Sequence, residues 1–272
     1  MPELPEVECI VRSLRAHVEG SWLLGVELRS ARVADAPSRQ WLGWMEPGRV
    51  QRLGRRGKFI VMELEGGVCA VHLRMTGRLV WNGPVGPYTR AVFHLGGGRV
   101  TLDDIRQFAR IEAGSACPAA VARLGPEPFE MTAEEFARRL RSRRARLKPL
   151  LLDQRFLAGL GNIYTDEALH RARLHPLQAA CRVSVKQARE LHRAILDVIS
   201  EAIAAGGSSV SDYVDGTGRR GEFQSAHRVY GREGQPCPDC GTPIRRIVVA
   251  QRGTWFCPRC QRAAGGRINT GR

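Results

Sequence analysis

The chain has 272 residues, of which 43% are hydrophobic, so it is long enough for one large domain or two of ordinary size. No apolar run approaches the roughly 20 residues that cross a bilayer, and no secretory signal is evident, so we expect a cytoplasmic protein that does not insert into membranes. Its 42 Lys and Arg residues outnumber 27 Asp and Glu residues, and the resulting net charge of +15 favours a polyanionic partner such as nucleic acid.

The positive charge is carried almost entirely by arginine, because the chain contains just three lysines, Lys58, Lys148 and Lys186. It is clustered in "RRGK" at 55–58 and "RSRRARLK" at 141–148. Arginine suits phosphate contacts but stays protonated, which makes it a poor nucleophile. Amine chemistry therefore has few candidate residues.

The opening "MPELPEVE" predicts the start of a helix, since proline and carboxylates suit a first helical turn. Apolar residues then follow at helical spacing as far as Val18. Residues 22 to about 115 have a β-rich pattern, with turns expected at Gly66-Gly67 and at the glycines of 96–98. The segment 115–130 is expected to be a boundary.

The pattern after this boundary is helical. Thr132 with Glu135 and Ser184 with Gln187 each match a capping box at a helix start. A helical stripe runs from Ala188 to Ala202, and the glycine-rich and polar stretch 207–221 is long enough to be mobile.

Four of the eight cysteines form two C-x2-C pairs separated by sixteen residues. This spacing is typical of a structural zinc site with four thiolate ligands, and an iron–sulfur cluster is the lesser alternative. The segment between the pairs is expected to form a hairpin with Arg252 at its turn. The predicted ligands are Cys237, Cys240, Cys257 and Cys260. We expect the scattered Cys9, Cys69, Cys117 and Cys181 to be reduced.

Three separated stretches, "PELPEVE", "GLGNIYTDEALH" and the cysteine-rich segment with "AQR", together resemble the formamidopyrimidine-DNA glycosylase family. The resemblance implies an α+β fold with DNA bound between its parts. Residues 1–130 would form a catalytic β-sandwich with flanking helices. Residues 131–228 would form a helix-two-turn-helix domain with a lesion-recognition loop, and residues 229–272 a zinc-ribbon hairpin.

The resemblance also implies a catalytic mechanism on oxidised purines in duplex DNA. Removal of Met1 would free the secondary amine of Pro2, which would attack C1′ of the damaged nucleoside and form an iminium ion. Elimination of both flanking phosphates would follow. Glu3 would transfer protons, Lys58 would contact a phosphate and aid catalysis, and Glu6 would support their geometry.

The remaining site residues implied by the resemblance contact DNA or the damaged base. Met75, Arg106 and Phe108 would fill the gap left by a flipped base. The backbone contacts would come from Asn162 and Arg252, with further contacts from His72 and Tyr230. The pocket for the damaged base would consist of Thr76, Ser208, Val210, Ser211, Asp212 and Tyr213.

Three residues depart from the family pattern: Arg155 stands where a lysine is common, Gln107 where a basic residue is common, and Ile105 where a proline is more usual. Three alternatives stay open. The enzyme could act on oxidised pyrimidines, Lys58 could form the iminium ion, or the chain could be a zinc-ribbon DNA-binding protein without catalytic activity. In each case we expect a monomer with one structural zinc ion and double-stranded DNA as partner.

Overall fold

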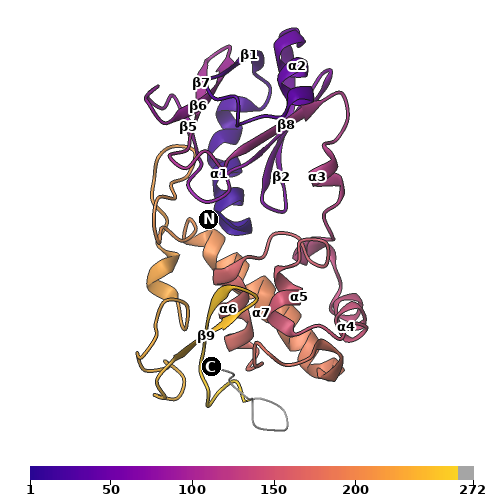
Figure 1. Cartoon of the computed structure of the whole chain (residues 1–272), viewed down its shortest axis with the longest axis vertical. Coiled ribbons are helices and arrows are strands. Elements are labelled where there is room, and N and C mark those ends of the chain that lie inside the picture. The colour runs from indigo at the N-terminus through magenta and orange to yellow at the C-terminus, as the bar shows by residue number, and fades with distance from the viewer. Residues whose placement is uncertain (263–272) are drawn as a thin grey trace. The chain divides into compact units, whose positions relative to one another are not determined.

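The computed structural model describes residues 1–262, and the chain forms two compact units (Figure 1). The first unit comprises Met1–Leu124 and Ala202–Gln224, and the second comprises Gly125–Glu201 and the chain from Ser225 on. The expected α+β class is confirmed by an antiparallel sheet, a helical region and a cluster of four cysteines. The three-part domain division, with boundaries at 130 and 228, stays a prediction.

The first unit contains eight strands in one antiparallel succession, in the order β5–β7–β6–β1–β2–β3–β4–β8. Strands β1 and β2 meet over two residue pairs, so the succession divides there into two four-stranded halves. One hydrophobic core takes side chains from both halves, as the predicted β-sandwich requires. The strands are β1 (Trp22–Leu28), β2 (Gly48–Arg56), β3 (Phe59–Leu64), β4 (Gly67–His72), β5 (Arg78–Trp81), β6 (Thr89–Leu95), β7 (Gly98–Asp103) and β8 (Arg110–Gly114).

Both predicted glycine turns join neighbouring strands. Leu64 pairs with Gly67 at the end of the β3–β4 hairpin, and Leu95 pairs with Gly98 at the end of the β6–β7 hairpin. A Cβ atom at position 67 would lie 2.4 Å from the carbonyl oxygen of Gly114. The close approach of β8 therefore requires glycine at this position.

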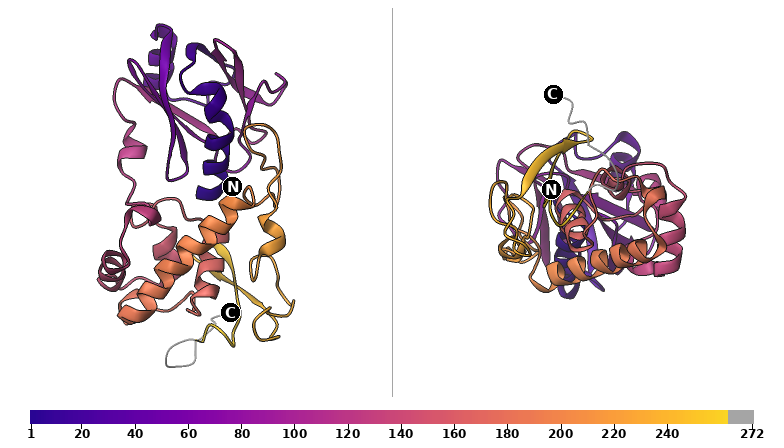
Figure 2. Two further views of the ribbon diagram at one scale, coloured as in Figure 1. Left: turned by 180° about the vertical axis from the view of Figure 1, so that it is seen from behind. Right: turned by 90° about the horizontal axis from the view of Figure 1, so that it is seen from below.

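Helix α1 (Leu4–Val18) confirms the helix predicted for the N-terminal segment. Its apolar residues at helical spacing are at most 1% exposed and belong to the core shared with the sheet: Val7, Ile10, Val11, Leu14 and Val18. The left view of Figure 2 shows this indigo helix beside the strands of the first unit.

Helix α2 (Ala36–Trp44) lies within the β-rich region 22–115 and is a flanking helix whose position the sequence pattern does not indicate. The Asp35 side chain accepts a hydrogen bond from the Ser38 N–H at 2.9 Å and caps the helix. Within α2, Ser38 and Leu42 are the buried residues, which leaves too little apolar periodicity to identify a helix. A single short turn, α3 (Ala119–Ala122), follows the sheet.

Beyond α3 the described residues form several helices, an irregular stretch between α7 and η3 (residues 205–222), and a two-stranded hairpin. Both predicted N-caps are confirmed, since Thr132 accepts the Glu135 N–H at 3.1 Å and Ser184 accepts the Gln187 N–H at 3.2 Å. None of the helices within residues 1–262 is long and apolar enough to cross a membrane. The elements are η1 (Pro128–Glu130), α4 (Ala133–Arg141), α5 (Leu147–Leu152), α6 (Asn162–Arg171), η2 (Ala180–Arg182), α7 (Val185–Ala204), η3 (Phe223–Ala226), β9 (Arg245–Val249) and β10 (Arg252–Phe256).

Candidate functional site

The N-terminus of α1 brings three of the predicted catalytic residues together. Pro2 is buried, and Glu3 and Glu6 are each 2% exposed. Glu3 is the N-cap residue and forms a capping box with Glu6, whose Oε2 accepts the Glu3 N–H at 2.8 Å. The second oxygen of Glu6, Oε1, accepts the Ser208 N–H at 2.8 Å. The Glu6 carboxylate thus ties the start of α1 to the segment that contains the predicted base pocket.

The segment after α7 approaches this carboxylate closely. Gly207 has a φ of +85°, and a Cβ atom there would lie 3.1 Å from Glu6 atoms. Tyr213 is buried, and its hydroxyl donates to the carbonyl oxygens of Gly206 at 3.0 Å and Glu6 at 3.3 Å. Burial raises the pKa of Tyr213, so the phenol stays protonated and acts as a donor.

The residues of the predicted base pocket differ in their exposure. Ser208 and Tyr213 are buried, whereas Val210 is 56% exposed and Ser211 is exposed. Asp212 forms an ion pair with Arg78 of β5 at 3.3 Å. The Ser208 N–H donates to Glu6 and is not available to a base. The exposed surface of this segment is formed by Val210 and Ser211.

Lys58 and His72 lie at the same end of strands β3 and β4. Lys58 occupies the turn between β2 and β3 and is 6% exposed. His72 pairs in register with Phe59, the residue that follows Lys58, and the two rings meet edge to face at 4.7 Å. Burial, with the nearby charges of Arg74 and Lys58, lowers the pKa of His72 to about 3. The Arg74 N–H donates to Nδ1 at 3.0 Å, so the neutral ring carries its proton on Nε2.

Asp104 organises the segments that carry the predicted gap-filling residues. This fully buried carboxylate accepts the N–H groups of Phe108 at 2.6 Å and Arg106 at 3.1 Å, and it also accepts the hydroxyl of Thr76. The Phe108 ring is 44% exposed, and the Arg106 guanidinium lies 4.8 Å from the ring centre. Asp104 lies two residues before Arg106 in the sequence, and nothing in its local pattern indicates this role.

Met75, next to Thr76, is likewise exposed, at 38%. An exposed methionine and an exposed phenylalanine held by one buried carboxylate can present an apolar surface without belonging to the core. Neither side chain is part of the hydrophobic core cluster of the first unit.

Asn162 and Arg252 lie near one another in the second unit. Asn162 is the first residue of α6, and its Nδ2 donates to the Gly253 carbonyl oxygen at 2.9 Å. Arg252 begins β10 and is exposed. Tyr230 packs on Trp255 of the same strand, with ring centres 4.6 Å apart.

Glu167 fixes the segment that leads to the zinc ribbon. Its buried carboxylate accepts the backbone N–H groups of Arg228, Val229 and Tyr230 at 2.8 to 3.0 Å. Three converging N–H groups satisfy a carboxylate that would otherwise be costly to bury. The role of Glu167 is not visible in the sequence, since its partners are 61 to 63 positions away.

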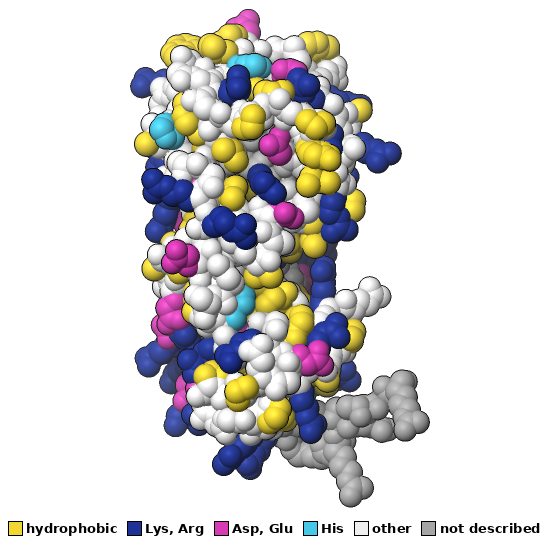
Figure 3. Space-filling model, turned by 90° about the vertical axis from the view of Figure 1, so that its left-hand side faces the viewer, with side chains coloured by type: hydrophobic (Ala, Val, Ile, Leu, Met, Phe, Trp, Pro, Cys, Tyr) yellow, Lys and Arg dark blue, Asp and Glu magenta, His cyan; other side chains and the backbone are white. Residues whose placement is uncertain are grey.

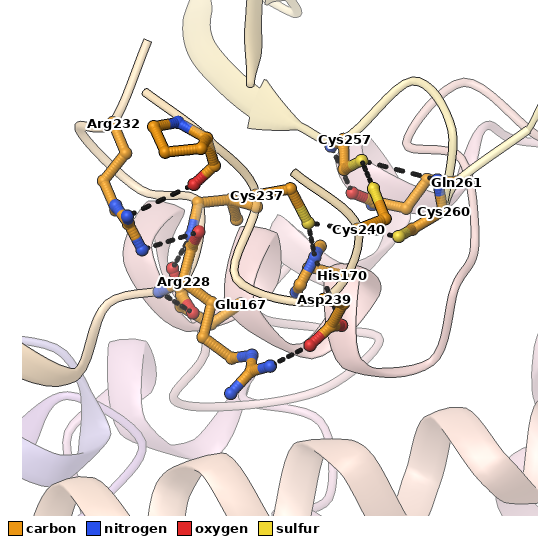
Figure 4. Close-up of polar contacts among 12 residues, drawn as sticks. Glu167, His170, Arg228, Arg232, Cys237, Asp239, Cys240, Cys257, Cys260 and Gln261 are labelled. Carbon is orange, nitrogen blue, oxygen red and sulfur yellow. Dashed lines mark hydrogen bonds and ion pairs between the residues drawn. The ribbon is translucent and has the colours of Figure 1, made fainter. Parts of the chain in front are cut away.

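The four predicted ligand cysteines converge, and all their sulfur atoms lie within 4.8 Å of one another (Figure 4). Sγ of Cys240 is 3.4 Å from that of Cys257, and Sγ of Cys237 is 4.0 Å from that of Cys260. Tetrahedral zinc with bonds of about 2.3 Å places its sulfur ligands about 3.8 Å apart. The cluster fits one zinc ion, which the chain uses as a structural cofactor.

His170 of α6 lies beside this zinc cluster, as Figure 4 shows. Its Nε2 is 3.4 Å from Sγ of Cys237 and 3.8 Å from a carboxylate oxygen of Asp239. A ring N–H directed at a ligand sulfur is a common means of stabilising a metal-bound thiolate. No nearby histidine was expected from the sequence, because His170 precedes Cys237 by 67 residues.

Two of the departures from the family pattern, Arg155 and Gln107, have different surroundings. Arg155 is exposed after α5. Gln107 has a φ of 57°, and its side-chain oxygen accepts the Ser30 hydroxyl at 3.2 Å. Gln107 is therefore engaged within the first unit.

Three family models match consecutive parts of the chain. Residues 1–111 match the formamidopyrimidine-DNA glycosylase N-terminal domain, and residues 124–214 match the formamidopyrimidine-DNA glycosylase H2TH domain. Residues 234–263 match the zinc finger found in FPG and IleRS.

Full-length relatives and solved structures give the same result. Formamidopyrimidine-DNA glycosylase of Solibacter usitatus is 49% identical over 96% of this chain and its own full length. The crystal structure of MutM (FPG) from Thermus thermophilus has a TM-score of 0.87 at 42% identity, covering 97% of this chain and 100% of that one. Lactococcus lactis Fpg in complex with DNA containing an abasic site has a TM-score of 0.86 at 31% identity, covering 96% and 99%.

Proposed function

Because the chain belongs to the formamidopyrimidine-DNA glycosylase family and is a DNA glycosylase of base excision repair, we propose that it removes oxidised purines from duplex DNA. We further propose that it cleaves the resulting abasic site through an iminium ion on Pro2. The observation that carries the mechanism is the arrangement at the start of α1, where Pro2 is buried beside the buried carboxylates of Glu3 and Glu6.

The chemistry begins once removal of Met1 makes the Pro2 nitrogen a secondary amine. The nitrogen attacks C1′, the bond from C1′ to the damaged base breaks, and the base leaves with a proton. Opening of the sugar ring oxygen, protonated by Glu3, leaves a C1′ iminium ion.

The iminium ion acidifies the C2′ protons, and loss of one of them expels the 3′ phosphate. A second elimination expels the 5′ phosphate, and water then releases the sugar fragment from the Pro2 nitrogen. Lys58 supports these steps by placing its positive charge near the leaving phosphates. The same charge contributes to the lowered pKa of His72, which keeps the imidazole neutral. A neutral His72 can donate its Nε2–H to a phosphate without adding charge.

DNA binding is supported by the basic composition and by the DNA complexes of the Lactococcus lactis relative. Lys and Arg side chains occur over much of the face drawn in Figure 3. We assign phosphate contacts to Asn162 and Arg252, with Tyr230 as a further contact. The exposed Met75 and Phe108, together with Arg106, would replace the stacking and pairing of a flipped nucleotide.

The damaged base would be held by Thr76 and by the segment from Ser208 to Tyr213. Exposure of Val210 and Ser211 supports a role for their backbone amides. The ion pair between Asp212 and Arg78 restrains the same segment. This assignment favours oxidised purines as substrates, and oxidised pyrimidines are the alternative.

Borohydride trapping tests the mechanism. Processed protein, with loss of Met1 verified by mass, should become covalently linked to duplex DNA that contains 8-oxoguanine opposite cytosine. Peptide mapping should place the adduct on Pro2, and Lys58→Ala should still form it. Absence of an adduct would reject the catalytic mechanism in favour of a non-catalytic DNA-binding protein, and an adduct on another residue would reject the role of Pro2.

A substrate panel separates the two classes of damaged base. Duplexes with 8-oxoguanine, a ring-opened purine or thymine glycol should be compared under single-turnover conditions. Faster cleavage of the two purine lesions is the expected result. Preference for thymine glycol would assign the chain to oxidised pyrimidines instead.

A further inference from the structure

Lys148 differs from its neighbours in the basic segment 141–148. The sequence placed it in a cluster suited to nucleic acid, but its side chain is fully buried while Arg141, Arg143 and Arg144 are exposed. Its ammonium group lies 2.7 Å from Oδ1 and 2.9 Å from Oδ2 of Asp166, whose side chain is 1% exposed. Lys148 therefore cannot contact DNA directly.

The ion pair is attached to the hairpin at two backbone groups. Lys148 Nζ donates to the Gly253 carbonyl oxygen at 2.9 Å, and Asp166 Oδ2 accepts the Trp255 N–H at 3.0 Å. Asn162 also donates to the Gly253 carbonyl oxygen, at 2.9 Å. Side chains of α5 and α6 thus hold β10 directly after Arg252.

Arg252 needs such an anchor because of where it stands. It follows a tight turn in which Ala250 and Gln251 both have positive φ values, 47° and 61°. A two-stranded hairpin is at best marginally stable by itself. The position of the exposed Arg252 side chain is therefore only as well defined as the position of β10, the strand that it begins.

The cost of burying the Lys148–Asp166 ion pair indicates that it has a role other than stabilising the fold. Burial raises the pKa of Asp166 to about 7, against the opposing effect of Lys148. Replacing a buried ion pair with apolar residues of similar volume is often neutral or stabilising. Apolar residues, however, could not hold the Gly253 carbonyl oxygen and the Trp255 N–H.

We propose that Lys148 and Asp166 are positioning residues for Arg252, which set the hairpin so that its guanidinium meets a DNA phosphate. This inference rests on the proposed function, in which Arg252 binds the DNA backbone. Neither residue touches DNA, so their effect on binding passes through Arg252.

The test uses the full chain and a duplex with a tetrahydrofuran abasic analogue, with affinity measured by anisotropy over a range of KCl concentrations. The variant Lys148→Met/Asp166→Leu replaces the pair with apolar side chains. We expect about tenfold weaker binding, and a salt slope reduced by about 0.9, the value for one lost phosphate contact. Adding Arg252→Ala to this variant should change neither quantity further.

Control variants separate positioning from charge and from folding. The pair variant leaves the net charge unchanged, whereas Lys186→Met removes one positive charge from an exposed site on α7 and should still leave the salt slope closer to that of the wild type. Zinc content and thermal unfolding show whether each variant is folded. If the apolar pair does not fold, Asp166→Asn keeps the side-chain volume and should weaken binding in the same Arg252-dependent manner.

Two results would overturn the proposal: an unchanged salt slope in the folded pair variant, or an additional loss when Arg252→Ala is added. An Arg252→Ala protein that binds like the wild type would also overturn it. Failure of the proposed function is distinguished by borohydride trapping of the wild type, which does not depend on Lys148.

Discussion

The eight-stranded sheet and the zinc ribbon differ in what holds their strands together. The sheet shares with α1 a large core in which side chains such as Phe93, Leu102 and Ile111 are at most 1% exposed. The ribbon has a small buried cluster of Val229, Ile244 and two of the ligand cysteines. A segment with so little apolar surface depends on metal bonds for its folding free energy, whereas the sheet depends on burial.

Removing one zinc ligand should have the largest effect and should be confined to the ribbon. We expect Cys257→Ser to lose its zinc to a chelator concentration that spares the wild type, because structural zinc contributes on the order of 10 kcal/mol. Metal analysis and limited proteolysis measure this, with cleavage expected between residues 229 and 262. Cys117→Ser, at an exposed cysteine outside the cluster, is the control. Full zinc retention by Cys257→Ser would contradict the assignment.

A cavity in the core of the sheet should destabilise the first unit and leave the zinc ribbon intact. Phe93→Ala should lower the free energy of unfolding by about 3–5 kcal/mol, because it removes a large side chain that is 1% exposed. Urea unfolding measures the loss, and zinc content should be unchanged. The matched change Phe129→Ala, at a side chain that is 51% exposed, should cost under about 0.5 kcal/mol. Equal costs at both positions would show that Phe93 is not a core residue.

Substitution of the buried Asp104 tests whether the polar contacts of the first unit affect stability only in their own neighbourhood. Asp104→Asn weakens the acceptor for the Phe108 and Ala109 N–H groups, so the loss should be about 1.5–3 kcal/mol. Hydrogen exchange should become faster at these two amides and stay unchanged in the zinc ribbon. Asp197→Asn, at an exposed position, supplies the control. Unchanged exchange at Phe108 would remove the organising role of Asp104.

The smallest effect concerns pH. The pKa of His72 is about 3 in the folded protein against 6.5 for a free imidazole, so the unfolded chain binds a proton first as pH falls. The stability present above pH 6.5 is therefore lost between pH 6.5 and 3, by about 1.4 kcal/mol at pH 5.5. His72→Gln should lack this part of the pH dependence when unfolding is measured at pH 7.5 and 5.5. An identical pH dependence in both proteins would show that His72 titrates normally.

The parts of the fold that the sequence predicts are those set by neighbours along the chain. The apolar spacing after Leu4, the glycine turns and the Thr132 cap depend on contacts within a few residues. The four cysteines are recognisable because zinc ligand chemistry imposes its own spacing. Helix α2 was missed since its few buried residues give no periodic signal.

The parts that the sequence does not predict depend on distant partners. Lys148 is buried because Asp166 and Gly253 meet it, 18 and 105 positions away. The same holds for Glu167, whose N–H partners begin 61 positions later. The roles proposed for Pro2 and Lys58 came from the family resemblance, since composition and spacing alone gave them no chemistry.

The burial of Pro2 behind an exposed Met1 has a practical consequence for anyone who produces this protein. A purification tag fused ahead of Met1 would leave the proline nitrogen acylated and would crowd the entry to α1. If the proposed role of Pro2 holds, such a preparation should still retain damaged duplexes on a gel, yet leave every strand uncut until a protease exposes the Pro2 nitrogen.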